Sequence, residues 1–294
     1  MRKLKDFYSL INLDEAVANS LLEMDNIFAK KHGSLLLDLS EKAFEPQLTL
    51  QGFNQLIEKA HQMAKEVELN KYSIELLFVC YCLIRLEKEF EKSNISKALY
   101  IDTVSDIKCK IRECQETFNV NGIFVGEWYY HFCKLKILRL GGLEYETKQA
   151  SHSYQNKGVR VEKGDKILSI HIPSDITLTH ENVIESLKLC YKYYGFTGKV
   201  PFICDSWLLY PNTIHLFPQK GNIRRFISYF DIVDKKDLEG FVDSYRVFKC
   251  FKIADYDLLP TQTTLQRNFL GYLKAGGKTG DGIGFLVFDG QNIL

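Results

Sequence analysis

A short part of the chain, between residues 166 and 206, combines side chains that suit acid–base chemistry with hydroxyls that suit anion binding. Histidine changes its charge near neutral pH, and a carboxylate accepts protons or binds cations. Hydroxyls placed just before a helix lie beside its unpaired N–H groups, which attract phosphate and other anions. The residues concerned are His171, Ser174, Thr177, Thr179, Asp205 and Ser206.

The sequence around these residues predicts a strand, a helix and a second strand. Apolar and polar residues alternate over 166–172, apolar residues recur at helical spacing over 180–194, and an apolar run covers 200–205. Such a βαβ unit has parallel strands and a right-handed crossover. Ligands bind beyond the carboxyl ends of its strands, where these polar residues lie. In the alternative interpretation, Thr179 only caps the helix and nothing binds there.

The composition is that of an ordinary globular protein. The chain has 294 residues, of which 46% are hydrophobic and 26% charged, and its formal net charge is +1. This balance gives no support to a nucleic-acid partner or a membrane surface. The length favours two domains or one large one.

Targeting and metal-binding signals are not found in the sequence. The N-terminal residues have no apolar core of a signal peptide, and the longest apolar run, residues 76–84, is too short to cross a bilayer. We therefore expect a cytoplasmic protein whose eight cysteines are reduced. The cysteines form no CxxC pair and the histidines lack metal-ligand spacing, so no metal is expected.

The pattern of apolar residues changes near residue 122. In the upstream part, apolar residues recur at helical spacing. The downstream part has short alternating runs and glycine turns, which predict strands, among them a hairpin between 159–161 and 167–172. The expected fold class is α+β, with a helical domain over residues 1–122 and a mixed-sheet α/β domain over residues 123–294.

Several short blocks in order along the chain make a more specific pattern than any one of them. Together they resemble a bacterial family of acyltransferase-domain proteins, in which a helical N-acyltransferase N-terminal domain precedes a GNAT-like C-terminal domain. The resemblance covers the second half of the chain best. The blocks are GEWY at 126–129, RLGGLEYE at 139–146, HIP at 171–173, LTHENV at 178–183, CDSWLL at 204–209, GNIRRF at 221–226, LPTQTTLQR at 259–267 and the glycines 276–277.

The resemblance implies that acyl-CoA is the co-substrate and lies between two parallel strands that splay apart. Its pyrophosphate would lie at the helix start, held by backbone N–H groups and by the hydroxyls of Ser174, Thr177 and Thr179. The backbone at Ile172 and Pro173 would lie along the pantetheine. The chain departs from the GNAT pattern in one respect, because the spaced glycines that usually precede this helix are absent.

Direct acyl transfer needs a base for the attacking amine and an acid for the leaving thiolate. The resemblance makes candidates of Glu144 with its same-face neighbour Glu146, and of His171, Asp205, Ser206 and Tyr210. Each has a structural alternative: a solvated strand face for the two glutamates, a packed strand end for His171, a turn for Asp205 and Ser206, and core packing for Tyr210.

The expected acceptor is an amine on a small molecule or a peptide. The main alternative is a non-catalytic sensor or assembly module that binds CoA or another small molecule on the same scaffold, and the missing glycines favour it. A third interpretation is an enzyme whose acyl donor is a carrier protein.

Overall fold

The computed structural model describes residues 3–294 and divides into two compact units. The first unit ends at Leu138 and the second runs from Arg139 to Leu294. This division falls later than the boundary that we predicted at residue 122. The segment after 122 belongs with the helices because the buried N–H of Gly126 donates to the Glu75 carboxylate at 2.6 Å.

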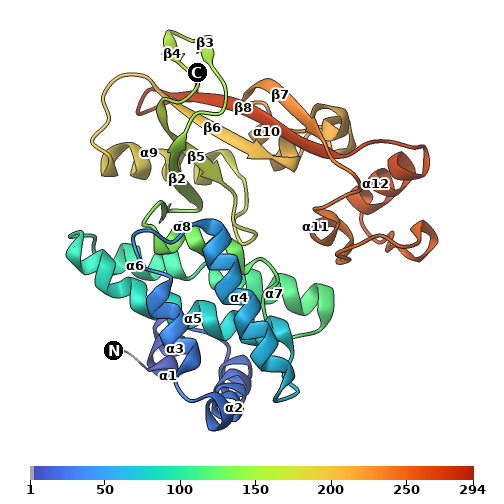
Figure 1. The fold of residues 1–294 in the computed structure, drawn as a ribbon. Coiled ribbons are helices and arrows are strands. Elements are labelled where there is room, and N and C mark those ends of the chain that lie inside the picture. Colours follow the sequence, from blue (N-terminus) through green and yellow to red (C-terminus); the bar gives the residue numbers. More distant parts are fainter. Residues whose placement is uncertain (1–2) are drawn as a thin grey trace. The chain divides into compact units, whose positions relative to one another are not determined.

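The first unit is helical, drawn in blue to green in Figure 1. Its long central helix, α5, is buried on all sides through its first half and packs against α3 and α4. Apolar residues at helical spacing over 101–118 suggest a single helix, but the structure divides this stretch between α6 and α7. The bounds are α1 Leu4–Leu10, α2 Glu15–His32, α3 Leu35–Lys42, α4 Leu50–Lys65, α5 Lys71–Lys92, α6 Lys97–Val104, α7 Ile107–Phe118, η1 Gly126–Trp128 and α8 Tyr129–Cys133.

The second unit is built on a mixed sheet with the strand order β1-β2-β5-β6-β8-β7 (Figure 1). Antiparallel ladders join β2 to β5, β6 to β8 and β7 to β8, whereas β5 and β6 run parallel. The bounds are β1 Ile137–Leu140, β2 Leu143–Gln149, β5 Lys166–His171, β6 Val200–Ser206, β7 Asp231–Asp237 and β8 Gly280–Phe288. The α+β fold class predicted from the sequence is confirmed.

One face of this sheet is covered by α9, His180–Tyr193. Its buried side of Val183, Leu187 and Cys190 faces the sheet, and the Ser186 hydroxyl bonds the Tyr145 hydroxyl at 2.9 Å. Because side chains alternate along a strand, Tyr145 marks the α9 face of β2, and its neighbours in the sequence point to the opposite face.

The opposite face is covered in part by a small hairpin, β3 Tyr154–Asn156 with β4 Val159–Val161. The Tyr154 ring stacks on Phe285 with the ring centres 4.6 Å apart. The predicted hairpin between 159–161 and 167–172 is therefore wrong. The turn at Gly164 leads β5 away from β4 and into the main sheet, where β5 can bury both of its faces.

Further short elements complete the second unit. They are η2 Trp207–Leu209, η3 Pro211–Leu216, α10 Asn222–Ile227, α11 Ser244–Phe248, η4 Tyr256–Leu258 and α12 Thr264–Lys274. The alternation over 224–233 suggests a strand, with a helix opening at 221–222 as the alternative. In the structure the helix α10 is formed, and the strand β7 begins only at Asp231.

The two parallel strands part soon after they meet. Within the described chain, their ladder consists of Leu168 with Phe202 and Ser169 with Ile203. Yet β5 continues beside β2 as far as His171, and β6 continues beside β8 as far as Ser206. The strands are thus parallel, as the βαβ interpretation predicted, and their carboxyl ends diverge, as the family resemblance implied.

Candidate active site

α9 follows β5 in the βαβ unit, so its first turn lies on the side of the sheet toward which the carboxyl ends of β5 and β6 point. Thr179 caps the helix, its Oγ1 accepting a hydrogen bond from the N–H of Asn182 at 3.2 Å. The Asn182 side-chain amide donates to the carbonyl oxygen of Thr177 at 2.8 Å. Thr179 and Asn182 thus fix the turn that leads into α9, and the remaining N–H groups of its first turn lack a carbonyl partner within the helix.

A carboxylate shares this helix start. Hydrogen bonds from its own backbone N–H and from Thr179 lower the pKa of Glu181, and the nearby charges of His180 and Arg225 lower it further. A negative side chain near a helix N-terminus is favourable by itself, but it repels a second anion at the same place. Glu181 and the cation of Arg225 therefore act with opposite signs on any anion near the start of α9.

The loop from β5 to α9 is held in a fixed path. An Nη of Arg139 donates to the Asp175 carboxylate at 2.8 Å, and the Ile176 side chain packs where a Cβ at Gly142 would lie. Glycine at 142 is required for this close approach. Of the predicted donor-binding residues, Pro173 is buried, Ile172 and Thr179 are half-buried, and Ser174 and Thr177 are exposed.

A histidine–carboxylate pair stands on the sheet face opposite α9, at the parting of the strands. His171 Nε2 lies 3.0 Å from an Oε of Glu146. Glu146 is 5% exposed, and Glu144, which lies opposite His171 in the β2–β5 register, is 2% exposed. The structure brings the predicted residues Glu144 and His171 together, and the hydrogen bond that orients the imidazole comes from Glu146.

The same face continues across the opening onto β6 and β8. Ser169 pairs with Ile203, Asp205 lies two residues further along β6, and Asp205 pairs with Ile283 of β8. The alternation of side chains then places Asp281 on this face too. We call these residues the carboxylate face, consisting of Glu144, Glu146, Ser169, His171, Asp205 and Asp281.

The acidity of Asp281, on this face, is perturbed by its surroundings. Burial raises the pKa of Asp281 to about 6, and the charges of Asp205 and Asp243 act in the same direction against the opposing charge of Lys236. These effects require the three carboxyls to lie near one another. The carboxylate face therefore attracts a cation and disfavours a further anion.

Ser169 adds a polar group without a hydrogen bond to this face. Its side chain is fully buried, and its Oγ has no hydrogen-bond partner within residues 3–294. It stands at the last rung of the β5–β6 ladder, two residues before His171. A buried hydroxyl without a hydrogen-bond partner costs free energy. A ligand or water in the strand opening would supply the partner that the Ser169 hydroxyl lacks.

The other predicted catalytic residues lie elsewhere. Ser206 Oγ accepts a hydrogen bond from the N–H of Leu208 at 3.2 Å and so caps η2. The Tyr210 hydroxyl donates to Asp237 of β7 at 2.7 Å, on the far side of β8 from the opening, and burial and Asp237 raise the pKa of Tyr210 to about 12. The catalytic roles of both residues stay predictions.

Ser169 and Asp281 are the residues of this face that sequence reasoning missed, and Asp281 is the instructive one. It lies in the run Gly280-Asp-Gly-Ile-Gly284, whose glycines are typical of a flexible turn. The structure shows why the glycines are there: a Cβ at Gly282 would collide with the Leu209 backbone, because η2 crosses directly over β8. Three glycines on one face of β8 leave the other face to Asp281 and Ile283.

The residues in the described chain form no group of three or more His, Cys, Asp and Glu side chains that could hold a metal ion.

Cys204, at the strand opening, is buried, and burial with the charge of Asp205 raises the pKa of its thiol to about 12. The thiol stays protonated at neutral pH and is a poor nucleophile.

Over residues 3–294, none of the helices combines the length and the apolar character needed to cross a bilayer.

Comparisons with solved structures show the same architecture over almost the whole chain. One similar structure is an acyltransferase mutant in complex with octanoyl-CoA; it has 15% identity and a TM-score of 0.62, and 97% of this chain matches 99% of that one. Another is an acyltransferase in complex with decanoyl-CoA and teicoplanin, with 15% identity, a TM-score of 0.61 and the same coverage. At this identity the likeness concerns the fold. None of the curated proteins matches the chain.

Family models divide the chain between them. An N-acyltransferase N-terminal domain matches residues 2–135, and a GNAT-like C-terminal domain matches residues 137–286, which is more than half of the chain. The resemblance inferred from the ordered sequence blocks is thereby confirmed: the chain belongs to the family of acyltransferase-domain proteins in which an N-acyltransferase N-terminal domain is followed by a GNAT-like C-terminal domain.

Proposed function

We propose that this protein is an N-acyltransferase that moves the acyl group of an acyl-CoA onto the amine of a small molecule or peptide. The observation that carries the proposal is the parting of β5 and β6 after the Ser169–Ile203 rung, on the side of the sheet from which the chain enters α9. Divergent parallel strands over a helix N-terminus offer backbone groups to an extended ligand and N–H groups to its phosphates.

The donor would enter on the α9 side of the opening. The pantetheine lies along the backbone of Ile172 and Pro173, where β5 has left β6. The pyrophosphate lies at the helix start, near the hydroxyls of Ser174, Thr177 and Thr179. Arg225 supplies a positive charge at the same place, as its influence on Glu181 supports.

The acceptor would react on the carboxylate face. The amine nitrogen attacks the thioester carbonyl, the C–N bond forms and the C–S bond breaks. The proton of the amine passes to His171 and from there to the departing CoA thiolate, so that the products are an amide and CoA. Glu146 holds the imidazole at 3.0 Å and stabilises its protonated form. Glu144, opposite His171 in the register, and Asp205 on β6 are the other proposed catalytic carboxylates on this face.

The test measures thiol release from acetyl-CoA and decanoyl-CoA with a panel of amines, and binding of both donors by calorimetry. His171→Ala is expected to lower kcat by roughly 10²- to 10⁴-fold, the range for loss of a general base. His152→Ala is the matched control, since its Nε2 lies 2.9 Å from Asp234 on the edge strand β7. Absence of both binding and thiol release overturns the proposal, and full activity of His171→Ala overturns the role of the histidine.

A second candidate function is a CoA-binding module without turnover. The missing spaced glycines before α9 favour it, because the chain departs there from the GNAT pattern. Calorimetric binding of acyl-CoA with no thiol release for any amine would support this candidate over the transferase.

A further inference from the structure

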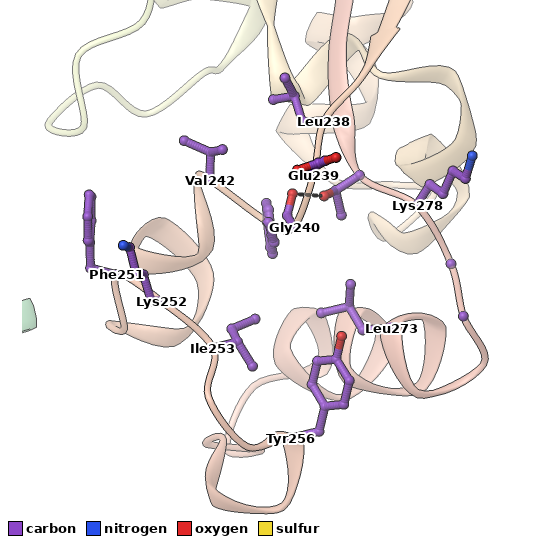
Figure 2. Close-up of a pocket in the computed structure, with 14 residues that line it drawn as sticks. Leu238, Glu239, Gly240, Val242, Phe251, Lys252, Ile253, Tyr256, Leu273 and Lys278 are labelled. Atoms are coloured by element: carbon purple, nitrogen blue, oxygen red, sulfur yellow. Dashed lines mark hydrogen bonds between the residues drawn. The ribbon is translucent and has the colours of Figure 1, made fainter.

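A cavity of about 590 Å³ opens in the second unit, beyond the ends of β7 and β8. Figure 2 shows its walls: Leu238, Gly240 and Val242 on one side, and Ile253, Tyr256 and Leu273 on the other. They come from three separate segments, namely the stretch after β7, the loop into η4 with the first residue of η4, and the end of α12. The cavity is as large as sites that hold small organic molecules.

The cavity is apolar inside and charged at its edge. Leu273 and Phe241 are buried in its floor, whereas Val242 is 53% exposed at its mouth. The charged side chains that line it, Glu239, Lys252 and Lys278, are exposed. Such a lining takes an aliphatic or aromatic body rather than a sugar or a phosphate chain.

The cavity adjoins the carboxylate face along two segments. Thr279 lines it and donates its hydroxyl to the Gly240 carbonyl at 2.8 Å, and Asp281 follows two residues later. Val242 lines it, and Asp243, whose charge is felt at Asp281, is the next residue. Two carboxylates that act on one another, Asp281 and Asp243, thus lie one or two residues from the cavity wall along the chain.

We propose that this cavity holds the apolar body of the acceptor, while Asp281 and Asp205 attract its ammonium group to the reaction edge. The acceptor class is then an amine attached to an aliphatic or aromatic body. This inference rests on the proposed acyl transfer.

The test compares two acceptors, tryptamine with an aromatic body and glucosamine with a polar one, with decanoyl-CoA as the donor. Wild type is expected to prefer tryptamine. Val242→Trp fills the mouth of the cavity from an exposed position, so it is expected to lower the tryptamine-to-glucosamine ratio of kcat/KM by roughly tenfold or more. Val233→Trp is the matched control, because Val233 is 40% exposed on β7 and does not line the cavity.

Asp281→Asn keeps the shape and removes the charge, and it is expected to raise KM for both amines with little change in kcat. The inference is overturned if wild type prefers glucosamine, or if Val242→Trp leaves the ratio unchanged. It is also overturned if Val242→Trp alters the preference for acyl-chain length, since the cavity would then hold the donor's tail. Absence of transfer to any amine would instead overturn the proposed function.

Discussion

Replacing Asp281 by Asn tests the electrostatics of the carboxylate face through stability alone. The structure raises the pKa of this carboxyl from 3.8 to about 6, through burial first and then the charges of Asp205 and Asp243. The charged form is therefore less favourable in the folded protein than in the unfolded chain. Asparagine has the same shape and carries no charge, so Asp281→Asn relieves this cost.

The size of the effect follows from the pKa difference. For a fully buried group, a rise of about two units corresponds to ~3 kcal/mol of unfolding free energy. Asp281 is only half-buried, so solvent screening reduces the expected gain to about 1 kcal/mol. The variant is thus predicted to be more stable and, as proposed above, a weaker binder of amines, a common compromise at functional sites.

The gain should depend on pH in one direction. Between its unfolded value of 3.8 and its folded value of about 6, Asp281 binds more protons in the folded state than in the unfolded state. Wild-type stability therefore falls as the pH rises through this window. The stabilisation by Asp281→Asn is expected to be near zero at about pH 4 and fully developed by about pH 7.5.

Urea unfolding followed by tryptophan fluorescence measures this gain. The chain has two tryptophans, so in a Trp128→Phe background Trp207 reports on the second unit alone. Asp231→Asn is the control of opposite sign, because Tyr154 and Lys157 hold the pKa of Asp231 low against the effect of burial. If Asp281→Asn destabilised the protein at neutral pH, or stabilised it equally at both pH values, the reasoning would be refuted.

The remaining predictions concern the helix start, the buried hydroxyl and two hydrogen bonds. Glu181→Gln removes a negative charge from the start of α9 and is expected to tighten CoA binding roughly two- to fivefold in calorimetry; weaker binding would contradict the proposed phosphate site. Ser169→Ala removes an unsatisfied buried hydroxyl and is expected to leave stability unchanged or raise it by up to ~1 kcal/mol; a large loss of unfolding free energy in urea would show that the hydroxyl has a hydrogen-bond partner. Glu75→Ala removes the acceptor of the Gly126 N–H and of His61 at 2.9 Å, and is expected to cost about 3 kcal/mol in the first unit. Tyr210→Phe is expected to lower stability by ~1 kcal/mol with near-normal kcat; unchanged stability with a strongly reduced kcat would instead make Tyr210 the general acid.

The βαβ unit could be predicted from the sequence because each of its elements has a local signal. Helical spacing and a capping threonine indicate α9, and two apolar runs ending in polar residues indicate β5 and β6. Parallel pairing follows from the length of the crossover. The expected strands and helix therefore match the structure to within a residue or so at each end.

What could not be predicted depends on pairing between distant strands. Glu144 and Glu146 look equivalent in the sequence, and only the β2–β5 register with the rotamer of His171 gives the hydrogen bond to Glu146. Asp281 joins the carboxylate face only because β8 inserts between β6 and β7. Tyr210 follows β6 closely in sequence, yet the turn at η2 directs its hydroxyl to β7.

The most direct test of the central claim is a crystal structure of the protein soaked with decanoyl-CoA. We predict that the pantetheine lies between the diverging ends of β5 and β6, with the pyrophosphate at the residues Thr177 to Asn182. The thioester should then face His171. CoA bound at another place, such as the cavity beside Val242, or an opening that stays closed by side chains with CoA absent, would contradict the claim.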